Sequence, residues 1–192
     1  MKIKKIFFII FILIFSTSNS FAMEVDVFIK STLNRATTIL SKDISKDDKI
    51  KELKILASDI SLDALNVATI NLQNYQVKNV LLIQSNWLAY AKTESLDLVI
   101  SNPPYLKSDD RHLKDLAHEP QSALVSPKGT KSFLEISQQA FIALKHEGRI
   151  IFEHGSSQRL EVTAILKDCG FKNIISGQDL QGLDRFIYAQ KL

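Results

Sequence analysis

The stretch LDLVISNPPY, residues 96–105, places an apolar run directly before an asparagine, two prolines and a tyrosine. A short run of leucine, valine and isoleucine that ends at a turn signal is typical of a buried β-strand. Proline lacks a backbone N–H and has a fixed φ, so Pro103 and Pro104 end the strand and stiffen the turn after it. The tip has two interpretations: a functional loop, or a tight turn in which Asn102 serves only as a cap.

Strands and helices alternate around this stretch. Further strands are predicted at 55–59, 80–85, 149–154, 172–180 and 184–190, and helices at 61–76, 132–145 and 159–170. This alternation predicts an α/β fold with a doubly wound, Rossmann-like parallel sheet and helices on both faces. The strands are apolar almost throughout, which agrees with a sheet that is covered on both faces.

The composition restricts the kinds of function. The chain has 192 residues, enough for one domain with a proper core, and its formal net charge of +3 does not by itself favour a nucleic-acid partner. Cys169 is the only cysteine, which excludes a disulfide framework and any multi-cysteine metal site. The histidines have no metal-ligand spacing, so we expect no metal centre.

The N-terminal residues have a different pattern. A basic MKIKK, an apolar run at 6–15 and small residues at Ser20 and Ala22 are typical of a secretory leader over residues 1–22. An uncleaved membrane anchor or a mis-joined start is the alternative, and this segment is the only membrane contact that we expect. Residues 23–54 predict two amphipathic helices. Together these residues weakly resemble the start of the periplasmic phospholipid-shuttle (toluene-tolerance) proteins.

Polar or aromatic side chains follow three of the predicted strands. Asp59 ends the strand at 55–59, Trp87 follows the strand at 80–85, and Asn102 follows the strand of the opening stretch. The carboxyl ends of parallel strands form the ligand-binding edge of such a sheet, so we expect these residues to meet on one rim.

Five short motifs support a family resemblance. ASDIS at 57–61, QSNW at 84–87, NPPY at 102–105, EPQSAL at 119–124 and IIFEHG at 150–155 occur in this order. NPPY alone is shared with DNA adenine methyltransferases. The ordered set over residues 55–192 resembles the release factor glutamine methyltransferases, which implies S-adenosylmethionine as cofactor, a peptide chain release factor with a Gly-Gly-Gln loop as partner, and a cytoplasmic location.

The resemblance implies a role for each residue of the NPPY loop. An amide nitrogen is a poor nucleophile because its lone pair is delocalised into the carbonyl. The side-chain oxygen of Asn102 and the carbonyl of Pro103 would accept the two amide hydrogens, which favours an attacking geometry. Pro104 holds the loop, Tyr105 packs on the planar amide, and Asn102 also borders the cofactor.

Four more residues receive roles from the resemblance. Asp59 would bind the ribose hydroxyls of the cofactor, with a helix N-cap as the alternative. Trp87 would border the adenine, with a core tryptophan as the alternative. Glu119 and Pro120 would form the loop on the substrate side.

The chain also departs from the family pattern. Such sheets begin with a strand and a glycine-rich loop that approaches the cofactor, yet this sequence has no glycine before Gly129. The sequence therefore predicts an incomplete sheet, without the first strand between the strands that end at Asp59 and Asn102. Cofactor binding is then expected to be impaired.

Four functions follow from these features. The first is an impaired N-methyltransferase of the release-factor type, and the second is a non-catalytic fusion or gene remnant with an exported-protein start. The third, a DNA adenine methyltransferase-like enzyme, would need a target-recognition domain that the sequence does not display. The fourth, a small exported lipid-binding protein based on residues 1–54, would need an apolar cavity, and nothing after Ile55 suggests one.

Overall fold

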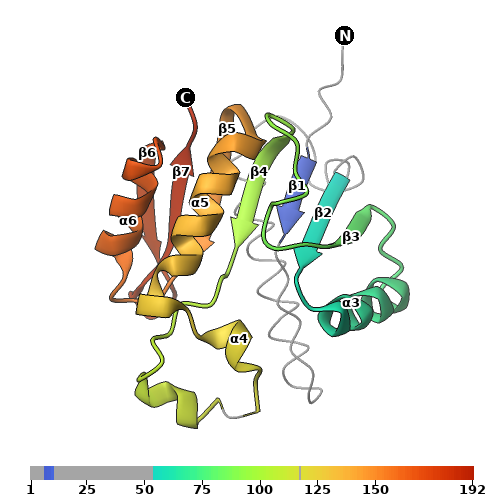
Figure 1. Ribbon diagram of the computed structural model, residues 1–192. Coiled ribbons are helices and arrows are strands. Elements are labelled where there is room, and N and C mark those ends of the chain that lie inside the picture. The colour runs from blue at the N-terminus through green and yellow to red at the C-terminus, as the bar shows by residue number, and fades with distance from the viewer. Residues whose placement is uncertain (1–6, 11–53, 117) are drawn as a thin grey trace.

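The computed structural model describes residues 7–10, 54–116 and 118–192, and its centre is one seven-stranded sheet. The strand order is β3-β2-β1-β4-β5-β7-β6 (Figure 1). The strands are β1 Phe7–Ile10, β2 Lys54–Asp59, β3 Val80–Gln84, β4 Leu96–Ser101, β5 Leu144–Glu153, β6 Lys172–Gln178 and β7 Asp184–Gln190. All neighbours from β3 to β5 pair in parallel, whereas β7 is antiparallel to both β5 and β6.

The helices connect the strands, as the alternation in the sequence predicts. They are α3 Leu62–Asn74, α4 Gln121–Leu124, α5 Lys131–Ala143 and α6 Arg159–Asp168, with short 3₁₀ turns at Arg111–Lys114 and Pro127–Gly129. In Figure 1, α5 lies across the sheet, and the segment that contains α4 lies beyond the end of β4. The α/β, doubly wound architecture is therefore confirmed, but the prediction of a parallel sheet is wrong at the edge formed by β7 and β6, where the sheet is antiparallel.

The prediction that the sheet lacks a strand between β2 and β4 is wrong. The strand β1 lies between β2 and β4, where it pairs through Ile9 with Leu56 on one side and Val99 on the other. It comes from the apolar run that was interpreted as a leader. An uninterrupted run of phenylalanine and isoleucine suits a central parallel strand as well as it suits a leader, because both environments are apolar throughout.

The other predictions about the N-terminal part concern residues that the structure does not describe. Apart from Phe7–Ile10, neither the leader over 1–22 nor the two helices over 23–54 can be compared with the structure, except that Lys54 opens β2. A boundary at residue 55 and the resemblance to phospholipid-shuttle proteins stay predictions. Across the described ranges 54–116 and 118–192, no helix is both long and apolar enough to span a membrane.

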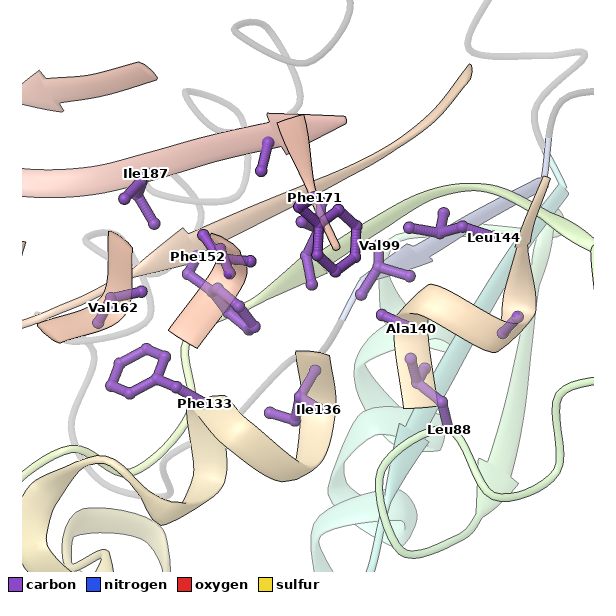
Figure 2. Close-up of a cluster of buried hydrophobic side chains, with 14 of the residues drawn as sticks. Leu88, Val99, Phe133, Ile136, Ala140, Leu144, Phe152, Val162, Phe171 and Ile187 are labelled. Carbon is purple, nitrogen blue, oxygen red and sulfur yellow. The ribbon is translucent and has the colours of Figure 1, made fainter. Parts of the chain in front are cut away.

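The core lies between α5, α6 and the strands β4, β5 and β7. Its members are all at most 4% exposed and include Val99, Phe133, Phe152, Val162 and Ile187 (Figure 2). The rings of Phe133 and Phe152 meet edge to face with centroids 5.2 Å apart, a geometry that aromatic pairs prefer. This packing fixes β4 and β5, whose carboxyl ends lie next to the NPPY loop.

Candidate active site

Asp59 lies at the end of β2, on the carboxyl edge of the sheet. Its side chain is buried, and its Oδ1 accepts a hydrogen bond of 2.8 Å from the backbone N–H of Ser61. Ser61 is the N-cap of α3, since its side chain accepts from the Ala64 N–H. Burial raises the pKa of Asp59, and its bonds to the N–H groups of Ser61 and Ile60 oppose that rise. The N-cap position itself thus belongs to Ser61.

Trp87 lies in the connection between β3 and β4 and is held from two directions. The Oγ of Ser58 donates to its carbonyl over 3.0 Å, while its indole Nε1–H donates to Oε2 of Glu135 on α5 over 3.0 Å. The next residue, Leu88, donates its N–H to Oε1 of Gln139, also on α5, over 2.7 Å. Trp87 has φ +53°, which is uncommon for a side chain of this size. It is half-buried and packs against the core.

The NPPY loop begins directly after Ser101, the last residue of β4. Pro103 and Pro104 are buried, while Asn102 and Tyr105 are partly exposed. All four line a cavity of about 830 Å³. The loop is thus a rigid wall of an open space, as two consecutive prolines predict.

The cavity brings together some of the predicted site residues and leaves out others. Besides the NPPY loop it is lined by Glu119, Gly155, Gln158 and Arg185, among others. Asp59, Trp87 and Pro120 are not among its lining residues. Pro120 is exposed and precedes α4 as its N-cap residue. The rim is therefore divided into a part around the NPPY loop and a part around Asp59 and Trp87.

Ionisable groups near the NPPY loop have altered pKa values. Burial raises the pKa of Tyr105, and the nearby Glu153 carboxylate adds to this rise, while Arg185 opposes it. Burial also raises the pKa of Glu153 and that of Glu119. Arg185 donates from Nε to Oδ2 of Asp179 over 3.1 Å. The Tyr105 hydroxyl is therefore uncharged at neutral pH.

Gln158 is a site residue that the sequence analysis missed. Its side chain is 8% exposed and makes three hydrogen bonds. Its Nε2 donates to the carbonyls of Tyr105 (3.1 Å) and Gly129 (2.9 Å), and its Oε1 accepts from the N–H of Gly155 (3.0 Å). The sequence offers only a glutamine before a helix, where serine, threonine, aspartate or asparagine is preferred, and this does not indicate its backbone partners.

The arrangement favours binding of a flat, uncharged polar group. Its wall offers acceptors on a proline-stiffened backbone and one aromatic ring, next to a cavity open enough for a side chain. Within residues 54–116 and 118–192, no group of three His, Cys, Asp or Glu side chains is placed to bind a metal ion.

Comparisons with known proteins agree with these features. The profile of the UPF0020 family, described as the RMKL-like methyltransferase domain, matches residues 15–132. The chain is 35% identical over 135 residues to a release factor glutamine methyltransferase of Shewanella oneidensis. The aligned region covers 69% of this chain and 47% of that protein. It is likewise 33% identical over 144 residues to a bifunctional methyltransferase of Rickettsia conorii, covering 72% of this chain and 28% of that protein.

A third relative gives a similar result. A release factor glutamine methyltransferase of Vibrio cholerae is 35% identical over 141 residues, covering 71% of this chain and 49% of that protein. The chain thus spans about half the length of the release factor glutamine methyltransferases that it matches.

Solved structures share the fold at low sequence identity. A methyltransferase from Pyrococcus furiosus has a TM-score of 0.53 at 12% identity, covering 72% of this chain and 63% of that one. A ribosomal protein L11 methylase from Lactobacillus delbrueckii also has a TM-score of 0.53, at 17% identity and with 72% and 58% coverage. A putative methyltransferase from Streptococcus mutans, solved with SAH, has a TM-score of 0.50 at 21% identity, with 72% and 76% coverage.

Proposed function

Because the chain belongs to the UPF0020 family of RMKL-like methyltransferase domains, we propose that it methylates a side-chain amide nitrogen of a protein, with S-adenosylmethionine as methyl donor. One observation carries the proposal: the Asn102–Tyr105 loop follows a central strand and forms one wall of a cavity of about 830 Å³. Relatives named release factor glutamine methyltransferases support a glutamine of a release factor as the acceptor.

The residues present fit part of the cofactor. The buried carboxylate of Asp59 at the end of β2 has the place and chemistry to bind ribose hydroxyls, and Trp87 lies after the neighbouring strand. When bound, S-adenosylmethionine supplies an electrophilic methyl group. The sequence has no glycine between β1 and β2 to allow a close backbone approach, so we propose that the cofactor binds more weakly than a glycine loop would allow.

The NPPY loop then orients the acceptor amide. The Asn102 side-chain oxygen and the Pro103 carbonyl accept its two hydrogens, which weakens the delocalisation of the nitrogen lone pair. Pro104 keeps the backbone rigid, and the uncharged Tyr105 ring packs against the carboxamide plane. With the cofactor bound, the oriented nitrogen would take the methyl group as the carbon–sulfur bond breaks, and the amide proton would leave to water.

Glu119 is the residue that we place on the substrate side, because it lines the same cavity as the NPPY loop. Pro120 has a structural role there, since it starts α4. In this proposal the partner is a peptide chain release factor presented through a Gly-Gly-Gln loop, and the protein works where that factor is found, in the cytoplasm.

The test uses the full 192-residue chain. Titration with S-adenosylmethionine comes first, followed by transfer of a labelled methyl group to a Gly-Gly-Gln peptide, with a Gly-Gly-Glu peptide as the negative substrate. We expect transfer to glutamine only. Asn102→Ala should reduce the turnover about 10²- to 10³-fold by removing one acceptor of the amide hydrogens, the usual effect of deleting one stabilising hydrogen-bonding group.

Asn74→Ala is the matched control, since Asn74 is exposed at the last position of α3. Its turnover should equal that of the wild type. Binding of S-adenosylmethionine without transfer would contradict the proposed acceptor. A folded protein that binds no S-adenosylmethionine would instead favour a non-catalytic remnant of a methyltransferase.

A further inference from the structure

We propose that Gln158 is a positioning residue for methyl transfer, because its buried carboxamide fixes the backbone at the end of the NPPY loop. This inference rests on the proposed function and adds a residue to it. The Gln158 side chain reaches Tyr105 of the loop, Gly129 before α5 and Gly155 after β5. It therefore connects three segments that are far apart in the sequence.

The hydrogen bonds of Gln158 match the capacity of its carboxamide. A carboxamide has two N–H donors and one oxygen acceptor, and here both donors and the acceptor have backbone partners. Replacing the NH₂ group by an oxygen would place that oxygen opposite the carbonyls of Tyr105 and Gly129. A buried amide that bonds only backbone groups fixes their positions irrespective of the side chains nearby.

The side chain does not serve its own helix. Gln158 is the N-cap residue of α6, yet its side chain makes no hydrogen bond to the first turn of that helix. The helix start is held by the backbone instead, through the Val162 N–H to the Gln158 carbonyl at 3.0 Å. Loss of the side chain should therefore affect the loops more than α6.

Two glycines make room for this carboxamide. A Cβ atom on Gly129 would lie 3.0 Å from the Gln158 Nε2 and 3.0 Å from the Tyr105 carbonyl oxygen, and Gly129 has φ +71°. A Cβ atom on Gly155 would lie 2.9 Å from the Gln158 Oε1. All three distances are shorter than ordinary contacts, so both positions need glycine as long as Gln158 holds this conformation.

The hydrogen bond from Gln158 to the Tyr105 carbonyl helps to hold the peptide plane between Tyr105 and Leu106. In the peptide group between Tyr105 and Leu106, the carbonyl accepts from Gln158 and the N–H donates to the Leu124 carbonyl at 2.9 Å. The Leu106 carbonyl in turn accepts from the Ser126 N–H at 2.9 Å. With both ends of the plane held, the position of the Tyr105 Cα atom is set, and this restricts where the Tyr105 ring can lie in the cavity wall.

The test compares two variants with the wild type. Gln158→Glu is isosteric and directs an oxygen at the two carbonyls, while Gln158→Leu removes the hydrogen bonds without adding a charge. For each we expect kcat per S-adenosylmethionine-binding molecule to fall about 10²-fold, the cost of misplacing a reacting group by about 1 Å. The dissociation constant of S-adenosylmethionine should stay unchanged, because Asp59 and Trp87 do not line the cavity that Gln158 lines.

A second measurement does not depend on activity. The exchange rate of the Leu106 amide proton should increase in both variants, while that of Ile150 in β5 should stay as in the wild type. Gln73→Glu is the matched control, since Gln73 is exposed on α3. It should change neither rate.

Two results would overturn the inference. One is an unchanged kcat per binding-competent molecule with only a lower melting temperature, which would make Gln158 a purely structural residue. The other is an unchanged exchange rate at Leu106. If the wild type transfers no methyl group to the peptide, the proposed function fails, and the exchange measurement alone then decides whether Gln158 fixes the loop.

Discussion

The two halves of the sheet are packed differently. In the half that bears the NPPY loop, α5 buries six side chains and β4 is buried at five of six positions. In the half that bears Asp59, α3 buries only Leu65 and Ala68, and β3 exposes 59% of Leu81. The fully buried members of the main core cluster come from the first half and from Leu88, and none comes from β2, β3 or α3.

This difference in packing separates the two tasks that we propose for the site, methyl transfer at the NPPY loop and cofactor binding at Asp59. The residues that we assign to transfer stand on a closed core. Asp59 lies at the end of the buried strand β2, beside the thinner packing of α3 and β3, and is held by local hydrogen bonds such as the one from Ser61. Trp87 joins the halves, since its indole bonds to Glu135 of α5. Substitutions in the two halves should therefore have separable effects on stability, on cofactor binding and on turnover.

The largest effect is expected for Ile9→Pro in β1, the strand between the halves. Ile9 pairs with Leu56 in β2 and with Val99 in β4. Proline removes a ladder N–H and does not fit the middle of a sheet, and each backbone group left buried and unpaired costs about 1–3 kcal/mol. Several such losses would use up a typical margin of about 5–15 kcal/mol, so we expect cooperative unfolding to disappear in urea titrations.

Ile9→Val is the control for this prediction, because valine keeps both the N–H and the β-branch. It should unfold cooperatively. The same experiment distinguishes a strand from a leader: if residues 1–22 are dispensable for the sheet, Ile9→Pro and Ile9→Val will have equal midpoints.

The next-largest effect is a loss in the free energy of unfolding, which we compare for one core residue from each half of the sheet. Phe133 is fully buried against Phe152, so Phe133→Ala should lower the free energy of unfolding by about 3–5 kcal/mol. Leu65 of α3 is 8% exposed and lies in the thinner half, so Leu65→Ala should cost about 2 kcal/mol, at the low end for such changes. Denaturant titration measures both, and equal losses would show that the halves are packed alike.

Much of the fold was predictable from sequence, and the failure at β1 has a physical cause. The apolar runs within residues 96–101 and 149–153 lie next to turn signals. β4 forms as predicted, whereas β5 begins earlier, at Leu144, where the last turn of a helix was expected. The run at 6–15 has no polar residue to define a face, so periodicity cannot distinguish a buried central strand from a leader. Only the partners Leu56 and Val99, far away in the sequence, identify it as a strand.

The site was predictable in its motif and not in its support. NPPY and Glu119 were found because they belong to the motifs that carry the family resemblance, and both line the cavity. Gln158 was missed because its partners are backbone groups of Tyr105, Gly129 and Gly155, which leave no pattern in a side-chain motif. Residues that hold a loop through the backbone become visible only once the chain is folded.

The smallest effect is expected for Asp59→Asn, which should change cofactor binding and stability in opposite directions. A hydrogen bond to a charged group contributes about 1.5–3 kcal/mol, so the dissociation constant of S-adenosylmethionine should rise about 10- to 100-fold in a calorimetric titration. Asparagine keeps the oxygen that accepts from the Ser61 N–H, so the local turn should survive.

For stability, the same substitution should be favourable: Asp59→Asn weakens cofactor binding but should raise the free energy of unfolding at neutral pH. Burial raises the pKa of Asp59, so the folded protein binds its proton more tightly than the unfolded chain does. In the wild type this contribution to the free energy of unfolding is fully present below the ordinary aspartate pKa of about 3.9, and it is lost as the pH rises through the raised value. Above that value the ionised, buried carboxylate destabilises the fold, and the neutral amide of Asp59→Asn does not.

The variant should therefore be more stable than the wild type in urea titrations at pH 7, with the difference shrinking towards pH 4. A variant that loses both cofactor affinity and stability at pH 7 would show that the thinner half depends on Asp59 for its packing, and the division between the halves would then fail.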